Sequence, residues 1–241
     1  MFNVFVNVYT FHMSTSTAPT KTRRVAPKRA KTADDPRQLR HQALADVRRE
    51  LVLDAARSAF FELGMEKASI REIAHRAGYT PGAIYSYFAS KEELYGTLLS
   101  ESLDRLNERV QETLDKKSPG PARARATAKA IFDFYRENPR DLDLGFYLFQ
   151  GMQPRGLTPE LNETLNARLR NALQPTQDAL QHIGMPTQQA LEEITALFAH
   201  TVGLLVLSHT GRIRMFKQAS QDLFEKYLEQ LINRAQTATR T

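Results

Sequence analysis

Within 23 residues, between Ser69 and Lys91, the chain gathers side chains that can form hydrogen bonds with nucleic acid: Ser69, Arg71, Thr80, Tyr85, Tyr87 and Lys91. Arg71 is the one side chain among them that can form a bidentate pair with guanine. The same segment contains the small residues Pro81, Gly82 and Ala83. A helix with such small side chains can approach base edges closely and contact thymine methyl groups. The chemistry expected of this segment is therefore recognition of double-stranded DNA.

Start and stop signals for helices position these side chains. Ser69 and Glu72 have the spacing of a capping box, which starts a helix, and Gly78 supplies a left-handed stop. Thr80 can cap a second, short helix whose first position is Pro81. A helix, a turn that contains glycine and a short second helix form the helix-turn-helix pattern, in which the second helix enters the major groove. The apolar residues are expected in the core, without DNA contact: Ile73, Ala74, Ile84 and Phe88.

The amino-acid sequence of this segment is more specific than the helix-turn-helix pattern alone. SIREIA at 69–74, AGYTPGAIYSYF at 77–88 and SKEEL at 90–94 resemble the DNA-binding signature of TetR-family transcriptional regulators, and the similarity runs from about Val52 to Leu94. The resemblance implies phosphate contacts for the four residues Ser69, Tyr85, Tyr87 and Lys91. It also implies a homodimer, paired through its last two helices, that places two recognition helices about one DNA turn, ~34 Å, apart.

Three of these residues have alternative roles. Tyr85 has a hydroxyl to satisfy and could be a half-buried core aromatic. Lys91 could be a solvated lysine in the first turn of a helix, where the helix dipole disfavours a cation. Arg71 could pair with a neighbouring acid rather than with guanine.

Charge and composition fit a nucleic-acid-binding protein. The net charge is +6; residues 1–95 contain 15 Lys or Arg against 10 Asp or Glu, and residues 96–241 contain 18 against 17. A basic N-terminal segment on a nearly neutral remainder is typical of nucleic-acid binders, although a solvated basic surface would look the same. The absence of cysteine excludes disulfides and thiolate metal sites and is consistent with a cytoplasmic protein. The longest apolar stretch, Ile194–Leu207, is interrupted and shorter than the ~20 residues of a membrane span.

Catalysis and metal binding are not expected. The chain contains no Walker loop, HExxH or GxSxG motif. His200 and His209 are nine residues apart and would lie on opposite sides of a helix, so they cannot share a metal. We therefore expect no enzyme, no metal and no cofactor other than a small-molecule effector.

Three regions are expected along the chain. Residues 1–42 form a disordered basic extension, which could lie on DNA or act as a solubilising tail. Within it, Met1–Met13 alternates apolar and polar residues without a partner strand, and translation is expected to start at Met13. Residues 43–95 form the helix-turn-helix domain, in which a first helix ends at Gly64 and Phe60 packs behind the motif. Residues 96–236 form a helical effector-binding and dimerisation domain.

The C-terminal region has helical patterns near 91–115, 122–138, 142–149, 158–183, 187–209 and 217–235 and no strand pattern, so the fold class is all-α. The last two helices have more apolar positions than one buried face needs, which suggests a subunit interface. Those positions are Ala190, Ile194, Leu197, Phe198, Val202, Leu205, Leu223, Phe224, Tyr227, Leu228 and Leu231.

The TetR resemblance implies an effector pocket in this region, and the residue types that suit an apolar ligand suit an ordinary core equally well. The candidates are Phe132, Tyr135, Phe146, Tyr147, Phe149, Met152 and His200. The function expected from the sequence is that of a homodimeric repressor that binds a palindromic operator and is released by a small molecule. The alternative is an effector-independent or architectural DNA-binding protein, which the absence of a pocket would favour.

Overall fold

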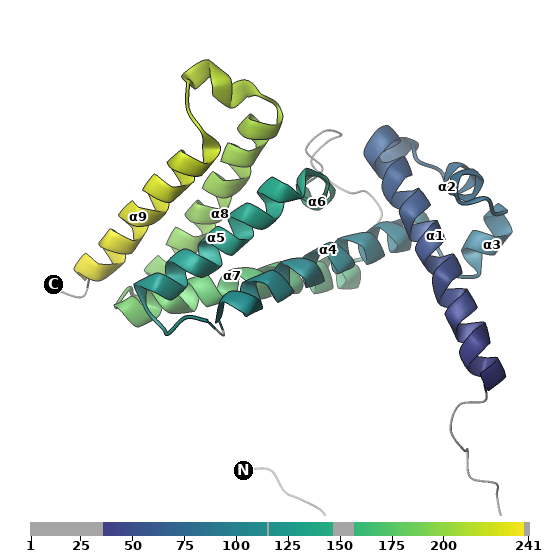
Figure 1. Ribbon diagram of the computed structural model, residues 1–241, viewed down its shortest axis with the longest axis horizontal. Helices are drawn as coiled ribbons and strands as arrows, with labels where there is room; N and C mark the ends of the chain where they lie inside the picture. Colours follow the sequence, from purple (N-terminus) through teal and green to yellow (C-terminus); the bar gives the residue numbers. More distant parts are fainter. Residues whose placement is uncertain (1–35, 115, 147–156, 239–241) are drawn as a thin grey trace, which may run out of the picture. The chain divides into compact units, whose positions relative to one another are not determined.

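A computed structural model describes residues 36–114, 116–146 and 157–238, and over these residues the fold is all-α, as predicted (Figure 1). The chain divides into residues 1–42 and residues 43–241, each described by itself. The helices are α1 (Pro36–Lys67), α2 (Ile70–Ala77), α3 (Pro81–Tyr85), α4 (Lys91–Leu114), α5 (Pro121–Glu137), α6 (Pro139–Phe146), α7 (Pro159–Ile183), α8 (Thr187–His209), the short 3-10 helix η1 (Arg212–Phe216) and α9 (Ser220–Ala238).

Helix α1 begins at Pro36, earlier than the start near residue 43 expected from the sequence. Proline is favoured at the first helical position because its missing N–H and fixed φ cost nothing there. Residues 36–42 are therefore helical rather than disordered, and the remainder of the expected extension lies outside the described residues. The expected break at Gly64 is confirmed, since this residue has φ 75° and ψ 165° before a last turn to Lys67.

A small apolar core holds α1, α2 and α3 together. Ile73, Ala74 and Ile84 are fully buried and Phe88 nearly so, as expected of residues that do not contact DNA. Phe60 of α1 is also buried and packs edge-to-face against a tyrosine of α4, with ring centroids 6.0 Å apart. Each large side chain contributes ~1.5–3 kcal/mol through burial. The helix-turn-helix is thus backed by packed side chains.

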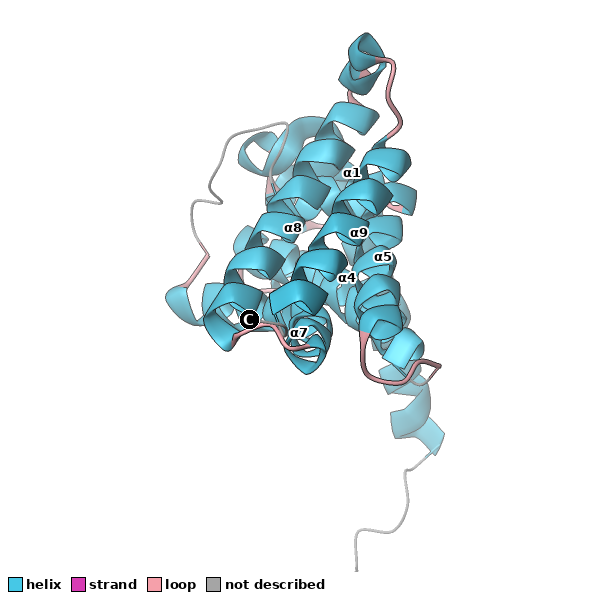
Figure 2. Cartoon of the chain, turned by 90° about the vertical axis from the view of Figure 1, so that its left-hand side faces the viewer, coloured by secondary structure: helices cyan, strands magenta, loops and turns pink. Residues whose placement is uncertain are grey.

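Helices α4 to α9 pack against one another. Helix α4 contacts α5 and α7, helix α7 contacts α8, and α8 pairs with α9. Figure 2 shows α8 and α9 side by side, with α7 and α5 next to them. Phe132 of α5 stacks on Phe224 of α9, with ring centroids 4.2 Å apart and an interplanar angle of 17°. Both rings are fully buried, so this pair lies at the centre of the core.

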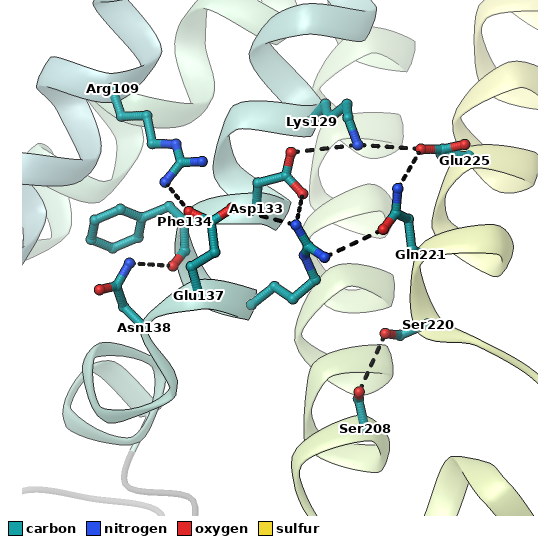
Figure 3. A network of polar contacts seen from close by, with 11 residues as sticks. Arg109, Lys129, Asp133, Phe134, Glu137, Asn138, Ser208, Ser220, Gln221 and Glu225 are labelled. Atoms are coloured by element: carbon teal, nitrogen blue, oxygen red, sulfur yellow. Dashed lines mark hydrogen bonds and ion pairs between the residues drawn. The ribbon is translucent and has the colours of Figure 1, made fainter.

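A surface network of charged side chains joins α4, α5 and α9 (Figure 3). Arg109 of α4 donates to Glu137 of α5 at 2.6 Å, and this hydrogen bond lowers the pKa of the Glu137 carboxyl. Lys129 of α5 lies 3.4 Å from Asp133 and 3.2 Å from Glu225 of α9. The Asp133 side chain is only 14% exposed, whereas the other members of these pairs are about a third to a half exposed. Exposed pairs contribute only ~0–1 kcal/mol each. They orient the helices, whereas the buried rings hold them together.

By length and composition alone, α8 could cross a membrane, which the sequence analysis did not expect. One such helix is weak evidence of a span, because core helices of globular proteins have the same composition. In this fold α8 packs against α7 and α9. Its buried residues include Ile194, Leu197 and Leu205, and 33% of the apolar window is buried.

Candidate DNA-binding surface and effector cavity

Side-chain caps start both helices of the helix-turn-helix. The Ser69 Oγ accepts the Glu72 N–H at 3.1 Å, and the Thr80 Oγ1 accepts the Ala83 N–H at 3.3 Å. Each cap satisfies an amide that has no partner within its helix and contributes ~0.5–2 kcal/mol. Ser69 and Thr80 therefore have a structural task in addition to the expected contact with DNA.

The turn between the two helices is built on Gly78. This residue adopts the left-handed conformation, with φ 71° and ψ 28°, and its N–H bonds to the last carbonyls of α2. The following N–H, of Tyr79, donates to the Ala74 carbonyl at 2.8 Å. Residues with a Cβ adopt this conformation at a cost, so the glycine stop predicted from the sequence has a physical basis.

The capping box at the start of α2 is only half formed. Instead of turning back to Ser69, the Glu72 carboxylate accepts the Arg76 Nε at 2.7 Å. Arg76 also donates to Glu62 at 2.8 Å and to Ser58 at 3.0 Å on α1. Hydrogen bonds from Ser58 and then Arg76 lower the pKa of the Glu62 carboxyl. Arg76 thus ties α2 to α1.

Arg71 and Tyr85 are both accessible. Arg71 lies on the exposed side of α2, and within the described ranges it forms no ion pair, because Arg76 takes the nearby acids. The Tyr85 side chain is 56% exposed, which is not the environment of a core aromatic. The geometry leaves both side chains available for DNA.

The start of α3 carries only small side chains on its surface. Pro81 and Gly82 are exposed and Ala83 is partly buried. A Cβ placed on Gly82 would meet only the Thr80 Oγ1, at 4.0 Å. Nothing within the described residues therefore requires glycine at position 82.

Lys91 has an intramolecular partner that the sequence did not suggest. Its ammonium group donates to the Met65 carbonyl, after the break in α1, at 2.6 Å. An ammonium group has three hydrogens, so two remain for a phosphate. Tyr87 is partly buried and packs against the core. A further cation, Arg49 of α1, lies 5.2 Å from the centroid of the Phe88 ring.

The effector-pocket candidates separate in the structure. Tyr135 of α5 and Phe146 of α6 line a cavity of about 120 Å³ between α4, α5, α6 and α7. Burial raises the pKa of the Tyr135 hydroxyl, so this group stays protonated. Phe132 belongs to the core instead, because Phe224 of α9 covers its ring. Tyr147, Phe149 and Met152 lie outside the described residues.

His200 does not line this cavity. It stacks on Tyr227 of α9, with ring centroids 4.3 Å apart, and burial lowers its pKa. Its Nε2 is buried and has no hydrogen-bond partner among the described residues. Among the residues that the structure describes, no three His, Cys, Asp or Glu side chains gather closely enough to hold a metal.

Both parts of the chain match a known family. Residues 52–98 match the profile described as bacterial regulatory proteins, tetR family, and residues 124–231 match that of a tetracyclin repressor-like C-terminal domain. The chain belongs to the TetR family. The resemblance found at residues 69–94 is thereby confirmed, and the protein is a transcriptional regulator with a DNA-binding domain and a ligand-binding-like domain, not an enzyme.

Other TetR-type proteins resemble the chain to different extents. The transcriptional activator FasR of Mycolicibacterium smegmatis is 36% identical over 101 residues, which are 42% of this chain and 46% of FasR. The regulator BetI of Yersinia pestis is 27% identical over 189 residues, covering 78% of this chain and 93% of BetI. The crystal structure of FadR from Bacillus subtilis in complex with stearoyl-CoA matches with a TM-score of 0.59 at 21% identity, over 76% of this chain and 97% of that one. At this identity, the likeness to FadR concerns the fold.

Proposed function

We propose that this TetR-family regulator is a homodimeric repressor that binds an inverted-repeat operator and leaves it when a small molecule binds the C-terminal domain. The observation that carries the proposal is the surface of α2 and α3, where Arg71, Pro81, Gly82 and Tyr85 are exposed while the apolar residues are buried. Relatives include a named activator and a named repressor, so the direction of control is part of the proposal. Its site of action would be the cytoplasm. Selection of bound sequences from random duplex DNA tests it.

The exposed side chains have different expected roles. Arg71→Ala should cost ~1–3 kcal/mol of binding and relax the preference for guanine at one position. Lys91→Ala should weaken binding to all duplexes alike and reduce the salt slope by about one, since one phosphate contact is lost. Tyr85→Phe should weaken binding to all duplexes without changing that slope. Fluorescence anisotropy with the operator and base-substituted duplexes at several salt concentrations measures all three.

Lys226 is an exposed lysine of α9. Lys226→Ala is the control for the loss of a positive charge and should leave DNA binding unchanged. Thermal unfolding shows whether losing the bond to Met65 affects the fold of the Lys91 variant. An equal loss of base preference in the three variants would contradict this division of roles.

The surface of α8 supports the homodimer. Ala196, Ala199 and Gly203 are exposed and, at spacings of three and four, lie on one face of this apolar helix. Small residues allow a second helix to approach closely. Most apolar positions that suggested an interface from sequence are instead buried within the protomer, namely Ala190, Ile194, Leu197, Leu205, Phe224, Leu228 and Leu231. Four remain partly exposed: Phe198, Val202, Leu223 and Tyr227.

Contacts of α6 support a link between the effector cavity and the DNA-binding helices. The Tyr95 hydroxyl on α4 donates to the Leu144 carbonyl of α6, beside the cavity-lining Phe146. The Arg140 guanidinium of α6 lies 4.5 Å from the centroid of the Phe61 ring of α1. A ligand that displaces α6 would therefore disturb α1 and α4, the helices before and after the helix-turn-helix. An effector-independent regulator, the alternative, would have no use for the cavity.

A further inference from the structure

The cavity at Tyr135 is an apolar chamber. It lies between four helices and is lined by Leu99 and Leu103 of α4 and by Leu165 of α7, among others. Its volume of about 120 Å³ is close to that of engineered cavities, ~150 Å³, that hold benzene. Ligand pockets usually have ~300–1,000 Å³, so the chamber alone accommodates only part of an ordinary effector.

A larger groove of about 770 Å³ lies between α7 and α8. Its α8 wall is mainly apolar and includes Ile194 and Phe198. The groove adjoins the chamber, because Asn162, Asn166 and Leu169 of α7 line both. Phe146 of the chamber and Phe198 of the groove are in ring contact, with centroids 5.6 Å apart.

The α7 wall of the groove carries a row of hydrogen-bonding side chains, spaced three or four residues apart: Asn162, Asn166, Arg170, Gln174 and Gln177. This spacing places them on one face over ~22 Å of helix. Gln174 donates to Asp178 at 2.7 Å. The other four form no side-chain hydrogen bond or ion pair with any residue in the described ranges. Amide side chains both donate and accept, so they match a ligand that carries amide or carbonyl groups.

We propose that chamber and groove together form one effector site for an elongated amphiphile, with its aliphatic tail in the chamber and a head group that carries amide or carbonyl groups along α7. This inference rests on the proposed ligand-responsive function and names the chemical class of the ligand. The chamber is too small for a whole effector. In the groove, the polar row of α7 lies beside Leu169 and Leu173 and faces a mainly apolar α8 side. Asn162 and Asn166 line both cavities, so a mainly apolar end and a more polar end adjoin each other.

The test is isothermal titration calorimetry of the whole chain with N-acylglycinamides, whose tails lengthen from butanoyl to dodecanoyl and whose heads carry two amides. Each added methylene that enters the chamber should lower the Kd about fourfold. The gain should stop after about six carbons, when the chamber is full. A Kd independent of tail length would overturn the proposal.

Two variants separate the tail site from the head site. A Cβ on Gly145, which lines the chamber, would lie 3.9 Å from the Leu99 Cδ1, so Gly145→Ala fits the fold while reducing the space. It should end the gain at a shorter tail and weaken the long members of the series about fourfold or more. Gln177→Leu, which changes the groove but not the chamber, should weaken all members alike, by about 2–12-fold, because it removes a hydrogen bond from the head.

Asn171→Leu is the matched control, since Asn171 is exposed on α7 and lines neither cavity; its Kd values should equal those of the parent. If a second copy of the chain fills the groove instead, Gln177→Leu will change the mass in light scattering and leave the Kd values unchanged, which overturns the proposal. Operator binding is measured separately. If the chain binds its operator but the Kd for the amides does not depend on tail length, only the proposed ligand class is refuted. If the Kd depends on tail length as predicted but the chain binds no operator, only the proposed regulatory function is refuted.

Discussion

Replacing Gly82 with alanine is expected to stabilise the protein and, at the same time, to weaken its binding to DNA. A Cβ at this position would meet only the Thr80 Oγ1, at 4.0 Å, and the residue is exposed. Glycine inside a helix costs ~0.5–1 kcal/mol relative to alanine, so the free energy of unfolding should rise by about that amount or less in so short a helix.

The loss of affinity has a steric reason. If α3 lies against the base edges, the added methyl group has no room, and overpacking of a close interface costs ~1–3 kcal/mol. This corresponds to a roughly 5- to 160-fold weaker Kd for the operator. Urea unfolding measures the first effect, and fluorescence anisotropy measures the second.

Asn171→Ala on α7 is a suitable control for Gly82→Ala. It also exchanges an exposed residue for a better helix former, and it should stabilise the fold without any change in DNA binding. An alanine at position 82 that leaves the operator Kd unaltered would show that α3 does not approach the bases closely. A loss of stability would show that the glycine serves the fold.

Ala199→Arg is expected to convert the proposed dimer into a folded monomer. Ala199 is exposed in the centre of the small-residue face of α8, and arginine is a good helix former, so the protomer itself should fold as before. Between two closely packed helices, however, the long charged side chain has neither space nor a partner. A monomer contacts one half-site only, and its affinity for the operator should fall on the order of a thousandfold or more.

Light scattering gives the mass of this variant, and anisotropy gives its affinity. Gln111→Arg places the same side chain on the exposed surface of α4 and should change neither quantity. A dimer of normal affinity that tolerates arginine at position 199 would place the subunit interface elsewhere.

The helix-turn-helix could be predicted from the sequence because its signals are local. Ser69, Gly78, Thr80 and Pro81 act within one turn of their own positions, and the structure places caps and breaks at these residues. The early start of α1 was missed because residues 37–42 are exposed and show no apolar periodicity. The Arg76 cluster with Glu62 and Ser58 was missed as well, although the Glu72–Arg76 spacing was a signal for part of it.

Which aromatic residues face a cavity could not be predicted. Phe132 and Tyr135 lie on the same helix, yet the first is covered by Phe224 of α9 and the second lines the chamber. This difference depends on side chains that are far away in the sequence. Hydrophobic periodicity within one helix carries no information about them. The same holds for α8 and α9, where most of the apolar residues that suggested an interface are buried within the chain itself.

The most direct test of the account is selection of bound sequences from random duplex DNA by the whole chain at two salt concentrations. A symmetric dimer that reads DNA through α3 predicts recovery of an inverted repeat with half-site centres about one helical turn, ~34 Å, apart, at both concentrations. Recovery of no shared sequence, with binding that disappears steeply as salt rises, would contradict the account. It would mean that basic residues hold DNA without reading it.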